Sequence, residues 1–447
     1  MPNLSRRKIL LSAISIGAVA TATSILGACK KIAKTNPAAF VKRDGLRFTI
    51  NDKPYRFVGA NLWYGAYLGA DAAYGDRARL GRELDRMKAI GITNLRVMAS
   101  AEEGPLKAGI KPGFRTKDGW NETLFDGLDY LMVEIAKRDM KAVLCLTNFW
   151  EWSGGVMTYL YYQTGKFTDM NDPEHPWPAF PDHASDFYKN EAAVGMYHDH
   201  VRRTVGRKNK ITGVDYRDDP AIMAWQLCNE PRPGNSQPVM DKILPDYYAW
   251  INSTAKIIRE IDGNHLVSLG QEGTKASNGS EQIFIEAHQQ IDYLTAHIWP
   301  LNWSWVDGKN LGGTWDDGAA KVNDYINTHV RLANQIGKAL VFEEFGFPRD
   351  GELYDPEIPA TFKERFYKMI YAAVEQSMAN NGPVVGSNFW AWNGEARTPH
   401  ADHRFKPGDT QYMGDPPHEP QGWYGVFDSD ASMHKIIMQH AKNISAS

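Results

Sequence analysis

From Leu46 onward, short apolar segments of the chain alternate with longer segments in which apolar residues recur at three- and four-residue steps. The short segments have the length and the β-branched and aromatic content of buried strands. Eight such strands are predicted, at 56–61, 94–98, 142–147, 222–228, 266–269, 293–297, 340–344 and 384–390. The longer segments are amphipathic, which predicts helices that cover a parallel sheet; they include 78–90, 124–140, 247–261 and 362–379.

This alternation predicts a (β/α)8 barrel, the TIM barrel fold, as a single domain over residues 40–447. Residues 46–50 and the turn-forming residues 51–54 predict a small N-terminal β-hairpin that plugs the barrel floor. The aromatic stretch from Tyr159 to Tyr188 is too long for a simple connection and predicts a long βα loop that forms one wall of a cleft. Functional side chains are expected at the carboxyl ends of the strands, where the βα loops gather.

The first 29 residues form a separate pattern, with a basic start and an apolar or small-residue run that ends in Leu26-Gly27-Ala28-Cys29. This pattern is typical of a signal peptide, and its last four residues resemble the lipobox of bacterial lipoproteins, in which the cysteine becomes the lipidated first residue. A membrane-spanning helix is the alternative, but the run is rich in small residues and only weakly hydrophobic. The adjacent Arg6 and Arg7 suit either a twin-arginine or an ordinary export signal. We therefore expect an exported lipoprotein at the cell envelope or extracellular surface, with lipidation at Cys29, a tether at 30–39 and membrane contact through the lipid anchor alone.

Composition narrows the function. The 447-residue chain is 43% hydrophobic, enough for a large core, and its 50 basic and 53 acidic residues leave no positive excess for binding nucleic acid. The 14 Trp and 20 Tyr suit a protein that stacks aromatic rings on sugars. Three cysteines cannot build a disulfide framework, and the sequence has no phosphate-binding or serine-hydrolase motif. No metal and no cofactor is expected.

Two glutamates stand at the ends of predicted strands. The strand at 222–228 leads into Asn229-Glu230-Pro231, and the strand at 340–344 ends in Glu343-Glu344 before Phe345-Gly346. Hydrolysis of a glycosidic bond requires a proton donor and a second carboxylate, and in retaining enzymes the two carboxyls are roughly 5 to 5.5 Å apart. An isolated Glu is usually a solvated ion-pair partner, but two glutamates at strand ends of one barrel predict catalysis.

The sequence at this point resembles glycoside hydrolase family 5, and within it the mannanase subfamily, subfamily 7. The resemblance spans nearly the whole mature chain in the family's order. It is carried by Gly59-Ala60-Asn61-Leu62-Trp63, Asn94-Leu95-Arg96-Val97, Leu146-Thr147-Asn148-Phe149-Trp150 with Gly154-Gly155, the run AWQLCNEPR at 224–232, His297-Ile298-Trp299-Pro300 with Trp303, Glu344-Phe345-Gly346, and Phe389-Trp390-Ala391-Trp392.

The resemblance implies a mannan endo-1,4-β-mannosidase that works by double displacement with retained stereochemistry. Glu230 is then the acid/base and Glu344 the nucleophile. The adjacent Glu343 competes for the second role, but side chains alternate along a strand, so one of the two points into the barrel mouth. The implied substrates are mannan, glucomannan, galactomannan and manno-oligosaccharides.

The same resemblance assigns supporting roles. Arg96 is expected beside Glu344, Asn229 at the sugar 2-hydroxyl, His297 at the acid/base or at a hydroxyl, and Trp390 under the sugar that is cleaved. The expected subsite walls are Trp63, Asn148, Trp150, Trp299 and Trp392. Many family members have Tyr where this chain has Trp299, so a Tyr hydroxyl that sets the nucleophile is missing there.

Three other functions remain open at this stage. An exo-acting β-mannosidase or mannobiohydrolase and a β-1,4-glucanase share the catalytic residues, so subsite geometry has to separate them. The third is a non-catalytic glycan-binding lipoprotein, but such a protein would not need Glu230, Glu344 and Arg96 together. Oligomeric state is left open.

Overall fold

The eight predicted strands are present and form a closed barrel. A computed structural model describes residues 40–446; the predicted signal peptide, Cys29 and the tether lie outside this range. The strands are β4 (Phe57–Asn61), β5 (Ile92–Met98), β6 (Lys141–Cys145), β7 (Ile222–Gln226), β8 (Leu266–Ser268), β9 (Leu294–Ile298), β10 (Leu340–Phe345) and β11 (Val384–Phe389). They pair in parallel in the order β8-β7-β6-β5-β4-β11-β10-β9. A parallel bridge between Ser268 and Tyr293 joins the two outer strands, so the predicted (β/α)8 barrel is confirmed.

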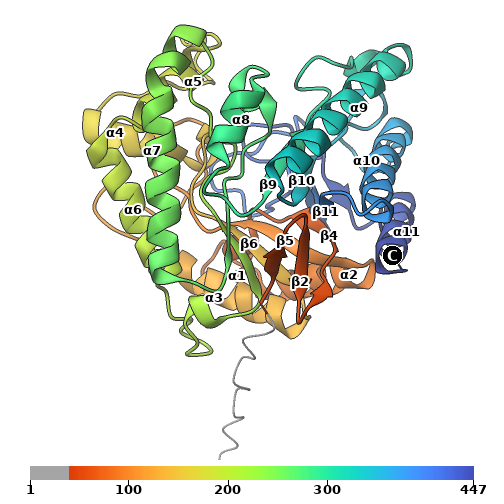
Figure 1. The fold of residues 1–447 in the computed structure, drawn as a ribbon, viewed down its shortest axis with the longest axis horizontal. Helices are drawn as coiled ribbons and strands as arrows, with labels where there is room; N and C mark the ends of the chain where they lie inside the picture. Colours follow the sequence, from red (N-terminus) through yellow and green to blue (C-terminus); the bar gives the residue numbers. More distant parts are fainter. Residues whose placement is uncertain (1–39, 447) are drawn as a thin grey trace, which may run out of the picture. The chain divides into compact units, whose positions relative to one another are not determined.

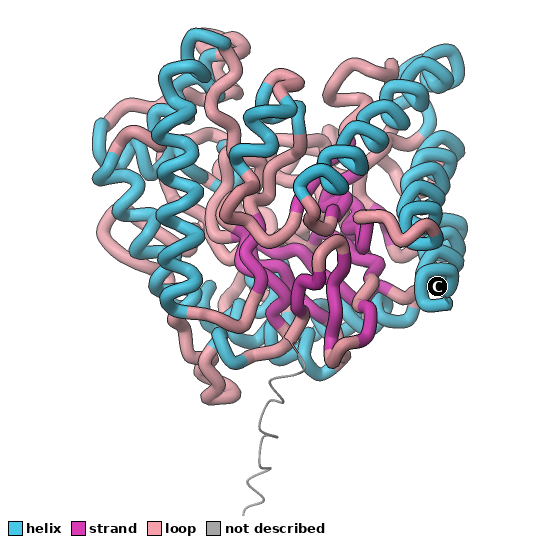
Figure 2. The backbone as a smooth tube through the Cα atoms, viewed as in Figure 1, coloured by secondary structure: helices cyan, strands magenta, loops and turns pink. Residues whose placement is uncertain are grey.

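Helices surround these strands (Figures 1 and 2). Four of them confirm the predicted amphipathic segments: α2 (Arg77–Ala89), α3 (Glu122–Lys137), α7 (Gln237–Ile261) and α10 (Thr361–Ala379). Helix α7 starts well before the predicted segment. The other helices are α1 (Gly65–Gly69), α4 (Gly155–Thr164), α5 (Ala179–Ala184), α6 (Glu191–Val205), α8 (Glu281–Ala287), α9 (Leu311–Ile336) and α11 (Ala431–Ala446). Asp76 and Asn121 cap α2 and α3 by accepting hydrogen bonds from first-turn amides.

The predicted hairpin is present and gains a third strand. Strands β1 (Lys42–Asp44), β2 (Arg47–Ile50) and β3 (Lys53–Pro54) form a small antiparallel sheet. Phe48 of β2 is buried against Phe57 and Tyr293, which lie where two barrel strands begin. The sheet therefore closes the amino-terminal end of the barrel and leaves the carboxyl end open for chemistry.

Two long segments rise above the carboxyl ends of the strands. The first follows β6 and contains α4 and α5; the second runs from β11 to α11 and contains the short pair β12 (Trp392–Gly394) and β13 (Val426–Phe427). The second segment is bound to helix α10, because buried Lys363 of that helix donates hydrogen bonds of 2.7 Å to the carbonyls of Tyr424 and Gly425. Among the residues described, no helix is both long and apolar enough to span a membrane.

Candidate active site

The carboxyl groups of Glu230 and Glu344 converge at the open end of the barrel. Glu344 lies on β10, while Glu230 lies just beyond β7, where its amide bonds to the carbonyl of Gly270 at 2.9 Å. Glu230 has a φ of 50°, a left-handed conformation that is uncommon outside glycine and that aims its side chain into the mouth. Carboxyl oxygens of both residues and a ring nitrogen of His297 lie within 4.8 Å of one another. That separation suits the retaining arrangement and is too short for the roughly 6.5–9.5 Å of an inverting pair.

Arg96, at the end of β5, organises the floor of the site. Its guanidinium donates to Glu344 at 2.5 Å and to Asn229 at 2.6 Å. It also donates to Gln226 at 2.7 Å and to Asn61 at 3.1 Å. Burial acts to lower the pKa of Arg96, but the charges of nearby glutamates outweigh burial and raise it. Arg96 is therefore a permanent cation held against the expected nucleophile.

His297, on β9, lies between the two carboxyls. Its Nδ1 is 2.6 Å from Glu230 Oε1 and 3.4 Å from Glu344 Oε2. Burial acts to lower the pKa of His297, but the carboxylates of Glu344, Glu230 and Glu343 raise it to about 10. Burial favours a neutral Glu230, yet the hydrogen bond and charge of His297 lower the pKa of Glu230 to about 2. For Glu344, burial outweighs His297 and Arg96 and raises the pKa to about 7. The proton shared by Glu230 and His297 thus rests on the imidazole, one short hydrogen bond from Glu230.

The adjacent glutamates of β10 point in different directions. Glu344 lines a cavity, whereas Glu343 is fully buried and accepts a hydrogen bond from Gln226 at 2.6 Å. This is the alternation that strand geometry requires. Of the two, Glu344 is therefore the carboxyl that faces the cavity.

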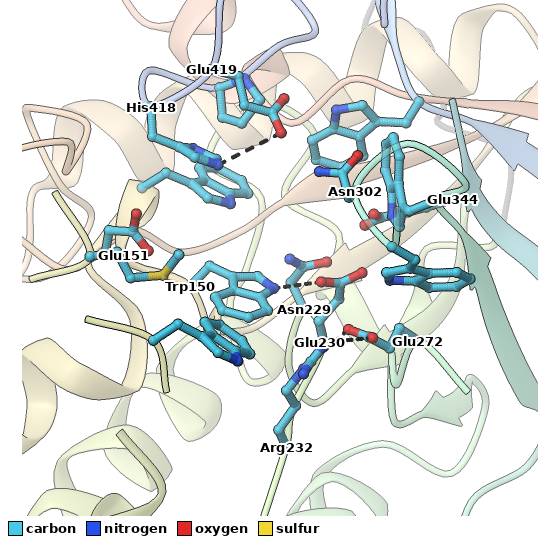
Figure 3. Close-up of a pocket in the computed structure, with 17 residues that line it drawn as sticks. Trp150, Glu151, Asn229, Glu230, Arg232, Glu272, Asn302, Glu344, His418 and Glu419 are labelled. Atoms are coloured by element: carbon cyan, nitrogen blue, oxygen red, sulfur yellow. Dashed lines mark hydrogen bonds and ion pairs between the residues drawn. The ribbon is translucent and has the colours of Figure 1, made fainter. Parts of the chain in front are cut away.

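A cavity of about 280 Å³ opens above the two glutamates, a size at the small end for a ligand pocket. In Figure 3 the indole of Trp150 points at Glu230, to which its Nε1 donates at 2.5 Å. His418 and Glu419 lie on the other side of the cavity from Arg232. The lining comprises Trp150, Glu151, Trp152, Met170, Trp177, Asn229, Glu230, Arg232, Glu272, Trp299, Asn302, Trp303, Glu344, Trp390, Pro416, His418 and Glu419. Such a mixture of indole faces and polar groups suits a sugar.

The structure brings most of the predicted site residues to this cavity or directly behind it. Arg96 and His297 support the glutamates from below, and Trp150, Asn229, Trp299 and Trp390 line the cavity. The predicted wall after β6 contributes Met170 and Trp177 to the lining.

Three residues expected as subsite walls do not line the cavity. Trp63 is buried among aromatic rings and donates to the carbonyl of Gly414, and Trp392 is buried and donates to Glu83. Asn148 is buried behind the site, where it accepts a hydrogen bond of 3.0 Å from Asn229 and so fixes the orientation of that amide. The two indoles are packing residues because their polar edges are already paired inside the protein.

Other lining residues were not predicted from the sequence. Arg232 and Glu272 form a buried ion pair at 2.5 Å beside the acid/base candidate. Glu419 comes from the β11–α11 segment, and burial raises its pKa well above the ordinary value. Arg232 follows Asn229-Glu230-Pro231 directly and could have been found from that motif. Glu419 has no sequence signal, because only the path of a long loop brings it to the site.

A metal ion is poorly suited to this cluster. Within residues 40–446, Glu230, His297 and Glu344 form a group whose ligand atoms are close enough to hold a cation. A metal, however, needs a deprotonated imidazole, and the pKa of His297 is raised to about 10. Arg96 also occupies one oxygen of Glu344. The chemistry of the donor set therefore favours proton transfer over metal binding.

A family model described as GH family 5 beta-mannosidase-like matches residues 38–447. The chain belongs to glycoside hydrolase family 5. A solved structure titled glycoside hydrolase family 5 mannosidase, from Rhizomucor miehei, superimposes with a TM-score of 0.82 at 33% identity, covering 92% of this chain and 99% of that one. The endo-1,4-beta-mannanase of the same organism is 22% identical with a TM-score of 0.66, and supports the fold alone.

Curated relatives in plants agree with this family. A putative mannan endo-1,4-beta-mannosidase 9 of Oryza sativa subsp. japonica is 27% identical over 86% of this chain and 89% of its own length. Mannan endo-1,4-beta-mannosidase 1 of Arabidopsis thaliana is 28% identical over 78% of this chain and 81% of its own. The predicted family is therefore confirmed, and this family 5 protein is a glycoside hydrolase.

Proposed function

We propose that this family 5 protein is a retaining hydrolase of β-1,4-mannosidic bonds in mannan, glucomannan, galactomannan and manno-oligosaccharides. The observation that carries the proposal is the approach of the Glu230 and Glu344 carboxyls, within 4.8 Å across the barrel mouth. The mannan-cleaving names of its curated plant relatives support the substrate class.

In the first step Glu230 protonates the leaving oxygen while Glu344 attacks the anomeric carbon. The proton moves from His297 to Glu230 along their 2.6 Å hydrogen bond, which leaves a neutral imidazole and an acid at the leaving group. Arg96 opposes the effect of burial on the pKa of Glu344 and so favours the ionised form that attacks. Asn229, oriented by Arg96 and Asn148, is placed to bind the 2-hydroxyl, a contact that strengthens in the transition state.

In the second step the ester between Glu344 and the sugar is hydrolysed. Ester formation removes the negative charge next to Glu230, which then acts as the base toward water. The water attacks from the side that the leaving group vacated, so two inversions give net retention of the β configuration.

The position of the cut along the chain depends on the cavity ends. The relatives named endo-1,4-beta-mannosidases support internal cleavage. Release of units from a chain end is a second mode, favoured by Pro416, His418 and Glu419, which the β11–α11 segment carries into the same small cavity. A time course on mannohexaose separates the two: mixed products from the start indicate internal cleavage, and a single small product with a shortening ladder indicates release from an end. Cellohexaose in parallel tests the glucanase alternative.

The roles of the two glutamates can be tested by azide rescue of alanine variants with an activated aryl β-mannoside. Glu230→Ala should still form the glycosyl-enzyme, which azide then attacks to give the β-mannosyl azide. Glu344→Ala should let azide attack the substrate directly and give the α-mannosyl azide. Glu343→Ala is the matched control on the same strand and should give no azide product. An α-azide from the Glu343 variant, or no rescue of either of the other two, refutes the assignment.

We also propose that Cys29 carries a lipid that attaches the exported protein to the cell envelope, on the strength of the Leu26-Gly27-Ala28-Cys29 pattern. Cys29→Ser should move the protein from the membrane fraction to the soluble fraction and abolish incorporation of labelled fatty acid. Unchanged fractionation and labelling would exclude the anchor.

A further inference from the structure

Trp177 is an exposed indole at the rim of the cavity. Among the residues described, it has the largest exposed fraction of any large hydrophobic side chain, 56%. It nevertheless lines the same cavity as Glu230. Exposing this much apolar ring to water is unfavourable, so an indole held at the mouth of a site is a candidate contact for a ligand.

The ring of Trp177 extends an aromatic surface that begins at the acid/base candidate. Trp150 donates to Glu230, and the ring of Trp177 lies 6.4 Å from that of Trp150 with 27° between their planes. On the protein side Trp150 runs nearly parallel to the buried Phe180, at 16°, and Arg232 lies 5.1 Å from the Trp150 ring. The surface therefore leads from Glu230 outward.

The segment that carries Trp177 is held in place by hydrogen bonds. The buried carboxylate of Asp169 accepts from the amides of Lys107 and Asn171, each at 2.8 Å. Thr168 Oγ1 is paired with His183 at 2.7 Å. A ring on such a segment is pre-positioned, which lowers the entropy lost when a ligand binds.

We propose that Trp177 is the platform for the second sugar on the leaving-group side of the cut. The acid protonates the leaving oxygen, so the surface that starts at Glu230 and passes Trp150 receives the departing part of the chain. The first departing sugar then meets Trp150, and the apolar face of the next one stacks on Trp177. The ligand class is a β-1,4-linked mannose chain that extends at least two residues beyond the cleaved bond. This proposal rests on the proposed function.

The test compares substrate lengths in Trp177→Ala, with Trp177→Phe to retain a ring. The matched control is Phe167→Ala, since Phe167 is an exposed aromatic residue of the same segment that does not line the cavity. Loss of an aromatic contact worth about 0.5–1.5 kcal/mol should lower the ratio of kcat/KM for mannotriose to kcat/KM for mannobiose about 2- to 12-fold. Trp177→Phe should restore most of the ratio, and Phe167→Ala should leave it unchanged.

An equal loss on both substrates, or an unchanged ratio, overturns the platform. Activity of the wild-type protein tests the proposed function. Binding measured without turnover tests the role of Trp177 separately from it. In a Glu344→Ala background, calorimetric titration should show that Trp177→Ala weakens the binding of mannotriose about 2- to 12-fold more than that of mannobiose. Equal weakening of both ligands overturns the inference even when the wild-type protein hydrolyses mannan.

Discussion

Replacement of Arg96 by Met should damage stability and catalysis together. Arg96 is buried and donates hydrogen bonds to four side chains, one of them the carboxyl of Glu344 at 2.5 Å. Removing one partner of a buried ion pair costs about 3–5 kcal/mol, because the other charge stays buried and uncompensated. A loss of that size in the free energy of unfolding should be visible in urea denaturation followed by Trp fluorescence.

The same change should weaken the nucleophile. Burial already raises the pKa of Glu344 to about 7, and Arg96 opposes that rise. Without Arg96 the pKa rises further, and below it each unit leaves about tenfold less carboxylate. Asn229 also loses its 2.6 Å donor. We therefore expect kcat/KM on mannotriose to fall by about 100-fold or more, with the acidic limb of its pH profile displaced to higher pH.

Arg96→Lys is the control, because it keeps the charge but cannot make the four bonds of the guanidinium. It should recover part of the stability, and its acidic limb should stay near that of the wild-type protein. If Arg96→Met changed the unfolding free energy by less than 1 kcal/mol and kcat/KM by less than threefold, the arginine would not be the counter-charge that the geometry indicates.

Three further changes test other parts of the structure. The pKa of His297 is raised from 6.5 to about 10, so its stabilising contribution is complete below pH 6.5 and is lost as the pH rises through 10. The difference in unfolding free energy between wild type and His297→Gln, measured by urea denaturation, should therefore narrow from pH 6 to pH 10. A constant difference would contradict the shift. Asp129→Asn should cost about 3–5 kcal/mol in urea denaturation, because buried Asp129 pairs with Arg207 at 2.8 Å, yet kcat of the folded protein should persist since neither residue lines the cavity. Lys363→Met should leave the carbonyls of Tyr424 and Gly425 without their donor and lower the unfolding free energy by about 2–4 kcal/mol. Because these carbonyls belong to the segment that forms one cavity wall, KM should rise more than kcat falls. An unchanged KM would mean that Lys363 does not position that wall.

Much of the barrel was predictable from the chain because its signals are local. A buried strand and an amphipathic helix each have their own period, and the eight strands lie within about two residues of their predicted ends at nearly every boundary. Alternation along a strand also separates Glu344, which lines the cavity, from buried Glu343. The family resemblance implied which strand ends carry the catalytic glutamates.

Side chains outside the strands were predicted less well. Trp63 and Trp392 stand in family motifs next to barrel strands, but Trp392 donates to Glu83, 309 positions away in the sequence, and Trp63 donates to Gly414, 351 positions away. No local pattern reveals such partners. Trp177 is the reverse case, an indole in a loop without a motif that reaches the cavity rim.

Short-range periodicity in the chain thus predicted the barrel and placed Glu230 and Glu344 at strand ends, and the family resemblance implied their roles. Tertiary structure alone decided which indoles pack in the core and which line the cavity, because burial depends on which distant loops meet above the strand ends. Tertiary structure also decided which side chains of the site hold protons. The pKa values of Glu230, His297 and Glu344 depend on burial and on charges that only the folded barrel brings together.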